Sequence, residues 1–360
     1  MKTKQICFFF ISILLIFKPI VGHSCTTFFL DQGVQYVFGR NYDFPIGDGL
    51  AVVNKRDVKK EGYSNTMLTW TSKYGSVTFN QFGREFPMGG MNETGLVVES
   101  MALEKTKYPK PDSRNVIEMA QWIQYQLDSF SSVEEVLSSN SKIRIRPISN
   151  APGVHFFVCD KSKACAVIEF IENKMVFYKN SDLPVKALTN DTYADSINGL
   201  ESNHIPQPDK FKSIERFIDA ANMVRAHGSK SDILPVDYAF SILDSASLPP
   251  FTQWTIVYNI PNLTIHFRTS NSLKIRHFSL KSFDFSCKTP VKIIDINNKL
   301  SGDISTQFDD YAYEMNLSIL TPGFRFIMDQ IVGRQLAEND FNYLLEHRAG
   351  YSMRTECTEE

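Results

Sequence analysis

The spacing of apolar and polar positions divides most of the chain into strand-like and helical runs. From 25 to 100 the apolar runs are short and are separated by Gly, Asn, Asp and Pro, which is typical of antiparallel strands. Further strand-like runs follow later in the chain, at 155–159, 165–170, 175–178, 252–258, 263–269 and 275–280. Helical spacing is found in the remaining apolar runs, at 115–127, 132–137, 212–223, 236–244 and 326–347.

The order of these runs indicates the fold class. Strands, helices, strands, helices and strands in succession predict an α+β protein, with two sheets and helices outside them, and not a parallel doubly wound sheet. One helix has a clear start signal, because Ser132 is followed three residues later by Glu135, as in a capping box.

The first two strands predict which residues lie near Cys25. The runs 25–30 and 35–39 flank a turn, and a two-residue loop at Gln32-Gly33 would set the sum of paired residue numbers to 65. Arg40 would then lie opposite Cys25, and a loop one residue different would shift that partner by one. In either case Arg40 and Asp43 return to the end of the strand that begins at Cys25.

Residues 1–24 have the layout of a secretory signal peptide. A basic start is followed by an apolar run at 7–17 and by small residues at Gly22 and Ser24. Cleavage after Ser24 would make Cys25 the first residue of a secreted or periplasmic protein. That residue would carry a thiol nucleophile and a free α-amine, which is a weak base.

Composition narrows the partners that we expect. The chain has 360 residues, with 38 basic and 40 acidic side chains and a net charge of −2. This balance does not indicate a nucleic acid or an acidic membrane as partner, and only the leader has a long apolar run. We expect one domain over 25–360, in which 281–360 is the less certain extension, and a homo-oligomer stays possible.

Cysteine usage leaves one thiol without a partner. Six cysteines are present, and Cys7 would leave with the leader. Across a short turn Cys159 and Cys165 face each other, and Cys287 and Cys357 could tie down the C-terminal part, so we expect these two disulfides in an oxidising compartment. Cys25 would then be free. Two alternatives are a disulfide at Cys25 and its lipidation, although Gly22 and His23 do not fit a lipoprotein signal.

Several short motifs stand in one order along the chain. They are Cys25-Thr26-Thr27, Phe38-Gly39-Arg40-Asn41-Tyr42-Asp43, Gly90-Met91-Asn92-Glu93-Thr94-Gly95-Leu96, Leu188-Thr189-Asn190, Glu215-Arg216-Phe217 and Thr252-Gln253-Trp254-Thr255. Together they resemble the choloylglycine hydrolase and penicillin V acylase family, over roughly 25–267. The resemblance implies the N-terminal-nucleophile hydrolase fold, a four-layer αββα sandwich of two antiparallel sheets, and hydrolysis of linear amides.

The resemblance assigns a role to each matched residue. Cys25 would attack the amide carbonyl, Arg40 would favour its thiolate, and Asp43 would accept hydrogen bonds from the α-amine. Arg40 and Asp43 could instead form an ordinary surface ion pair, worth roughly 0–1 kcal/mol.

Further along, Asn190 would donate its amide to the tetrahedral oxyanion, and Arg216 would hold Asp43 or Asn190 in place. Asn190 could instead be only a residue of a strand-to-helix turn, and Arg216 could be a solvent-exposed charge on a helix. At Ala102, where bile-salt enzymes of the family carry Asn and penicillin V acylases Tyr, only a backbone N–H remains for the oxyanion. Asn92 matches the family as well, but its surroundings indicate a turn.

These residues predict an N-terminal cysteine amidohydrolase that acts on a small acyl-amide substrate. Conjugated bile salts are the first candidate substrate, and phenoxyacetyl penicillins and N-acyl homoserine lactones follow. The histidines lack the close spacing of metal ligands, so neither a metal nor a cofactor is expected. The alternative from another class is a secreted binding protein that has this fold and no activity.

Overall fold

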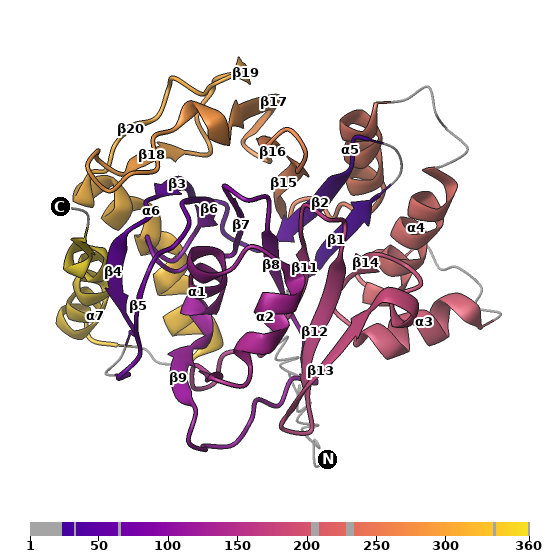
Figure 1. Cartoon of the computed structure of the whole chain (residues 1–360), viewed down its shortest axis with the longest axis horizontal. Helices are drawn as coiled ribbons and strands as arrows, with labels where there is room; N and C mark the ends of the chain where they lie inside the picture. Colours follow the sequence, from indigo (N-terminus) through magenta and orange to yellow (C-terminus); the bar gives the residue numbers. More distant parts are fainter. Residues whose placement is uncertain are drawn as a thin grey trace, which may run out of the picture.

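The computed structural model describes residues 24–31, 34–63, 66–202, 209–227, 234–333 and 336–358. Two large sheets lie face to face, and helices cover their outer sides (Figure 1). The predicted signal peptide lies outside these ranges except for Ser24. Within the described ranges, no helix is long and apolar enough to span a bilayer.

The seven-stranded sheet has Cys25 at the start of its second strand. Its order is β14 (Ala187–Leu188), β1 (Cys25–Leu30), β2 (Val37–Asp43), β15 (Thr252–Asn259), β16 (Thr264–Thr269), β17 (Ser272–Ser279) and β19 (Gly302–Asp303). In the β1–β2 ladder Cys25 lies opposite Tyr42 and Thr27 lies opposite Arg40. The predicted pairing of Cys25 with Arg40 is therefore wrong by two residues. Because side chains alternate along a strand, a shift of two keeps Arg40 on the same face as Cys25.

The nine-stranded sheet forms the second layer. Its order is β13 (Lys174–Lys179), β12 (Cys165–Ile171), β11 (Val154–Cys159), β8 (Val97–Ala102), β7 (Gly89–Asn92), β6 (Ser76–Asn80), β3 (Leu50–Asn54), β18 (Lys292–Asp295) and β20 (Asp309–Asp310). Two small sheets flank it, one of β9 (Asn115–Glu118) with β10 (Ile143–Arg146), the other of β4 (Val58–Glu61), β5 (Thr69–Thr71) and β21 (Glu356–Cys357).

Both faces of the nine-stranded sheet are buried, and successive side chains along a strand point to opposite faces. On β11, Phe157 and Cys159 join the core between the two sheets, whereas Phe156 and Val158 pack with residues of α1 (Trp122–Ser129) and α2 (Val133–Ser139). Such burial contributes about 1.5–3 kcal/mol for each large apolar side chain.

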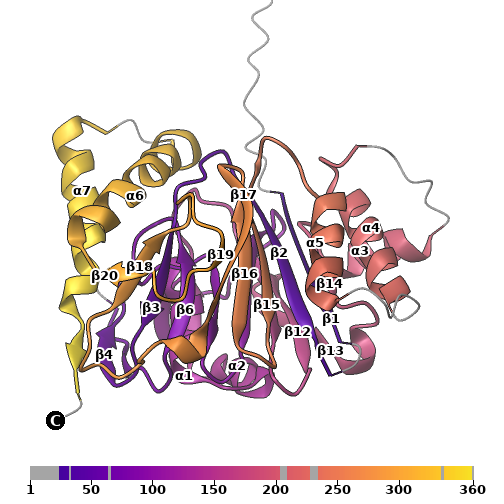
Figure 2. The same ribbon diagram turned by 90° about the horizontal axis from the view of Figure 1, so that it is seen from above.

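Helices complete the outer layers. On the seven-stranded sheet, α4 (Ser213–Ala226) and α5 (Pro235–Ser245) pack against β1 and β2, and α3 (Tyr193–Glu201) packs against α4. Figure 2 shows α3, α4 and α5 on one side of the molecule, opposite α6 (Tyr313–Phe326) and α7 (Glu338–Gly350). The predicted αββα sandwich is confirmed.

Two predicted helices differ from the structure. Over 115–127, the first four residues are β9, which pairs in parallel with β10, and only the part from η1 (Met119–Gln121) onward is helical. Strand pairing between distant segments overrides the local spacing there. Over 326–347, α6 continues into a π-helical turn, η5 (Ile327–Ile331), and the break before α7 contains Gly333 at a φ of +68°. Glycine reaches that conformation without the steric cost of a side chain.

The C-terminal part packs onto the nine-stranded sheet. The strand β18 pairs with β3, and Met315 and Ile319 of α6 pack on the core cluster that contains Leu50 and Val52. Both expected disulfides are present, Cys159–Cys165 across the β11–β12 hairpin and Cys287–Cys357 in the C-terminal part, and Cys25 is free. The assignment of 25–360 to one domain stays a prediction.

A buried charge cluster links β4 to α1. The Lys60 Nζ lies 2.7 Å from Glu85 Oε2 and 3.0 Å from Asp128 Oδ2, and all three side chains are shielded from solvent. A cation in this position offsets the desolvation of two carboxylates.

Replacing this cation should destabilise the fold strongly. We expect Lys60→Met to lower the free energy of unfolding by about 3–5 kcal/mol, because it leaves buried carboxylates without their counter-charge. The matched control is Lys292→Met, which breaks an exposed pair with Asp310 and should cost less than about 1 kcal/mol. Urea unfolding curves measure both values, and equal losses would contradict the assignment.

Candidate active site

Cys25 lies at the start of β1 with its sulfur buried. Its side chain is 4% exposed and lines a cavity of about 220 Å³. Because β1 lies between β14 and β2, residues from both neighbours approach it. Ser24 precedes Cys25 in the structure, so the Cys25 nitrogen is a peptide N–H here.

Arg40 contacts the sulfur from the neighbouring strand. Its Nη2 donates to Cys25 Sγ at 3.7 Å, and its Nη1 donates to the Ser100 carbonyl at 2.5 Å. The same Nη1 lies 3.0 Å from Glu99 Oε2, and Tyr258 donates to the other Glu99 oxygen at 2.5 Å. Arg40, Glu99 and Tyr258 are all buried, so this is an interior ion pair and not a surface one.

Asp43 lies at the end of β2, beside a β-bulge. Thr252 pairs with Asp43 and Trp254 with Tyr42, so that Gln253 is the extra residue on β15. The Thr252 hydroxyl donates to Asp43 Oδ1 at 2.5 Å, whereas the buried Oδ2 has no hydrogen-bond partner in the described part of the chain. Burial raises the pKa of Asp43 to about 7, although the Thr252 bond and the charges of Arg216 and Arg40 lower it.

Asn190 holds the Cys25 nitrogen. It follows β14, and its Oδ1 accepts from the Cys25 N–H at 2.6 Å and from Arg216 Nη2 at 2.8 Å. Its Nδ2 donates to the Ala102 carbonyl at 2.9 Å. Arg216, buried on α4, also donates to the carbonyls of Lys210 and Phe211. The side-chain amide is therefore fixed at both ends.

All six residues chosen from the sequence meet at this point, with differences in detail. In the structure the peptide N–H of Cys25 donates to Asn190 Oδ1, and a hydrogen bond from a free α-amine to Asp43 stays a prediction. Asn190 Nδ2 has two hydrogens. One is donated to the Ala102 carbonyl, so the other is the one that could be donated to an oxyanion. Arg216 binds Asn190, which was one of its two expected partners. Asn92 is structural, because it donates to the Leu127 and Phe130 carbonyls at 2.9 and 2.8 Å.

Two opposing effects act on the Cys25 thiol. Burial raises its pKa, and it outweighs the opposing effects of the Arg40 charge, the Asp43 backbone hydrogen bond and the Arg216 charge. Arg40 favours the thiolate, as expected, but its charge does not offset the burial. The thiol has to lose its proton to a base within the site when it reacts.

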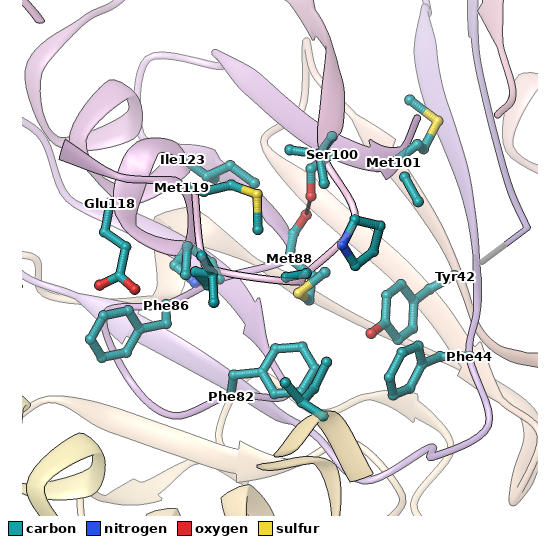
Figure 3. Close-up of a pocket in the computed structure, with 18 of the residues that line it drawn as sticks. Tyr42, Phe44, Phe82, Phe86, Met88, Ser100, Met101, Glu118, Met119 and Ile123 are labelled. Carbon is teal, nitrogen blue, oxygen red and sulfur yellow. Dashed lines mark hydrogen bonds between the residues drawn. The ribbon is translucent and has the colours of Figure 1, made fainter. Parts of the chain in front are cut away.

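The cavity wall is largely apolar. Figure 3 shows Tyr42 and Phe44 at one end, Glu118 and Phe86 at the other, and Phe82, Met88 and Met119 between them. Phe44 and Tyr63 are aromatic residues of this wall. In the described part of the chain, no three His, Cys, Asp or Glu side chains are grouped as metal ligands are.

Part of this wall was not predicted. The C-terminal helices and the turn between them contribute Phe324, Ile327, Met328, Val332 and Arg348. Helical spacing in 326–347 indicated a helix but not which surface it covers. Glu99 was also missed, although an acidic residue within the apolar run of β8 signals a buried partner.

The known proteins that this chain is similar to are hydrolases of linear amides. Residues 25–198 match the family of linear amide C–N hydrolases described as the choloylglycine hydrolase family. A penicillin V acylase of Pectobacterium atrosepticum is 26% identical over 323 residues, which cover 74% of this chain and 83% of that protein.

Two solved structures share the fold. A penicillin V acylase of Agrobacterium tumefaciens has a TM-score of 0.69 at 22% identity, and covers 80% of this chain and 98% of its own. A variant of conjugated bile acid hydrolase from Clostridium perfringens has a TM-score of 0.65 at 21% identity, over 77% of this chain and 98% of its own.

The raised pKa of Asp43 predicts how stability depends on pH. Between its ordinary value of 3.8 and about 7, the folded protein holds a proton that the unfolded chain has released, so stability falls as pH rises. We expect Asp43→Asn to reduce this slope by up to about 1.4 kcal/mol per pH unit near pH 5–6. The exposed Asp182→Asn should leave the slope unchanged. Urea unfolding across this pH range measures it, and an unaltered slope in Asp43→Asn would refute the raised pKa.

Proposed function

We propose that this chain is an N-terminal cysteine amidohydrolase for N-acyl amides with apolar acyl groups, because residues 25–198 match the choloylglycine hydrolase family of linear amide C–N hydrolases. One observation carries the proposal. Cys25 lines a largely apolar cavity, and the nitrogen of the same residue donates to Asn190 Oδ1 at 2.6 Å.

The proposal requires that the leader is removed after Ser24, in a secreted or periplasmic protein. Cleavage turns the Cys25 nitrogen from a peptide N–H into an α-amine with an ordinary pKa of about 7.7–8.0. Because burial raises the pKa of the thiol, a base beside the sulfur is needed, and this amine supplies it. Asn190 Oδ1 orients the amine, and the unpartnered Asp43 Oδ2 offers a second acceptor.

The reaction then proceeds through an acyl-enzyme. Cys25 Sγ attacks the amide carbonyl while the α-amine takes the thiol proton. The oxyanion is stabilised by the second Asn190 amide hydrogen and by the Ala102 backbone N–H. The α-ammonium returns the proton to the leaving amine, and water, activated by the same amine, hydrolyses the thioester. Arg40 stabilises negative charge on the sulfur, and Arg216 keeps Asn190 in position.

The cavity suggests the acyl group. An apolar wall with aromatic and methionine side chains suits aryl or long alkyl groups, and leaves the polar leaving amine outside. Phenoxyacetyl amides become the first candidates, since a curated relative and a solved structure with this fold are penicillin V acylases. Conjugated bile salts, the first candidate from the sequence, come second, and N-acyl homoserine lactones third.

The nucleophile is tested by substitution at Cys25. We expect Cys25→Ala and Cys25→Ser to lose nearly all turnover of penicillin V, glycocholate, taurocholate and acyl homoserine lactones while both variants remain folded. A Met retained before Cys25 should abolish activity as well, because it converts the α-amine to an amide. Turnover retained in Cys25→Ala would exclude the nucleophile. Mature protein that begins elsewhere would favour a binding protein without activity.

Asn190 is tested against a matched control. We expect Asn190→Ala to lower kcat about 10²–10³-fold, because an oxyanion donor and the orientation of the α-amine are lost together. Asn198→Ala, an exposed residue on α3, should leave kcat unchanged. Steady-state kinetics on the best substrate of the panel measure both, and a loss confined to KM in Asn190→Ala would contradict this role.

A further inference from the structure

The end of the cavity away from Cys25 is polar. Tyr42, which pairs with Cys25, lies at one end in Figure 3, and Glu118 lies at the other. Arg348 of α7 lines the same cavity. An apolar acyl group would leave Glu118 Oε2 without a donor and would give Arg348 no partner beyond those that the protein supplies. The proposed reaction also assigns them no role.

Glu118 is a buried acceptor with unused capacity. It is the last residue of β9, its side chain is 9% exposed, and Oε2 has no hydrogen-bond partner within the described ranges. Buried carboxylate oxygens are nearly always paired, because an unpaired one loses its hydration without replacement. This oxygen therefore indicates a missing donor.

Arg348 is a buried donor close by. Its Nε donates to the Phe82 carbonyl at 3.1 Å, and its Cζ lies 3.1 Å from the centre of the Phe86 ring. The charge of Glu118 acts on it, raising its pKa against the larger lowering by burial. Among the described residues, however, no ion pair within 4.0 Å joins Arg348 to Glu118. The two opposite charges face one cavity without touching.

We propose that Glu118 and Arg348 form a distal subsite that selects acyl groups with a hydroxyl at the end remote from the amide. A hydroxyl can donate to the Glu118 carboxylate and accept from the Arg348 guanidinium at once. A methyl group does neither, a carboxylate is repelled by Glu118, and an ammonium is repelled by Arg348. This inference rests on the proposed function, because it assumes that the acyl group occupies the cavity.

Binding to a variant without the nucleophile tests the subsite separately from catalysis. The probes are N-acyl glycines of increasing chain length, each made with a terminal hydroxyl and with a terminal methyl group. By calorimetry on Cys25→Ala protein, we expect the hydroxyl form to bind about tenfold or more tightly at the chain length that reaches the subsite. Adding Glu118→Leu should reverse the preference, and Glu118→Gln, which keeps an acceptor, should retain part of it.

Controls separate this effect from a general loss of structure. Glu104→Gln, an exposed carboxylate outside the cavity, should leave the preference unchanged, and thermal melting checks that each variant is folded. Equal binding of both forms at every length, or a preference that survives Glu118→Leu, would overturn the subsite. Turnover by protein with Cys25 tests the proposed function independently. Selective binding without turnover would refute the reaction and keep the subsite.

Discussion

The hydrogen bond from the Cys25 nitrogen to Asn190 Oδ1 is the contact on which the site depends. The β1–β2 ladder fixes where Cys25 lies in the sheet, and this bond holds its nitrogen beside the sulfur that Arg40 contacts. The Asn190 side chain is held in position for this bond, because Arg216 donates to its oxygen and the Ala102 carbonyl accepts a hydrogen bond from its nitrogen. Helix α4, the β14 turn and the nine-stranded sheet thus converge on one amide.

Burial and charge oppose each other around this contact. Burial raises the pKa of the Cys25 thiol, and it raises those of Asp43 and Glu99 to about 7. Arg40 lies between the sulfur and Glu99 and lowers the pKa of both groups. The site therefore holds ionisable groups at a cost in stability, which is common where chemistry requires desolvated charge. The Glu99–Tyr258 hydrogen bond keeps Arg40 in place beneath the sulfur.

Short motifs and the local spacing of residues in the sequence predicted the features that are set by residues close together in the chain. The resemblance to the family of linear amide C–N hydrolases is found again over 25–198, and the αββα fold, both disulfides and the capping box at Ser132 are confirmed. The predictions were wrong or incomplete where contacts between segments distant in the sequence determine the structure. The β1–β2 register depends on turn geometry, β9 exists because β10 pairs with it, and the wall formed by α6 and α7 requires tertiary packing. The net pKa of the thiol could not be predicted either, because burial is a property of the folded chain.

The central claim is that a free α-amine and the thiol of one residue act together. Acid quenching during turnover of the best substrate, followed by mass spectrometry of the N-terminal peptide, tests it most directly. The account predicts a peptide that begins at Cys25, with a free amine and with the acyl mass on its sulfur. An acyl group on another residue, or an active enzyme that still carries residues before Cys25, would contradict it.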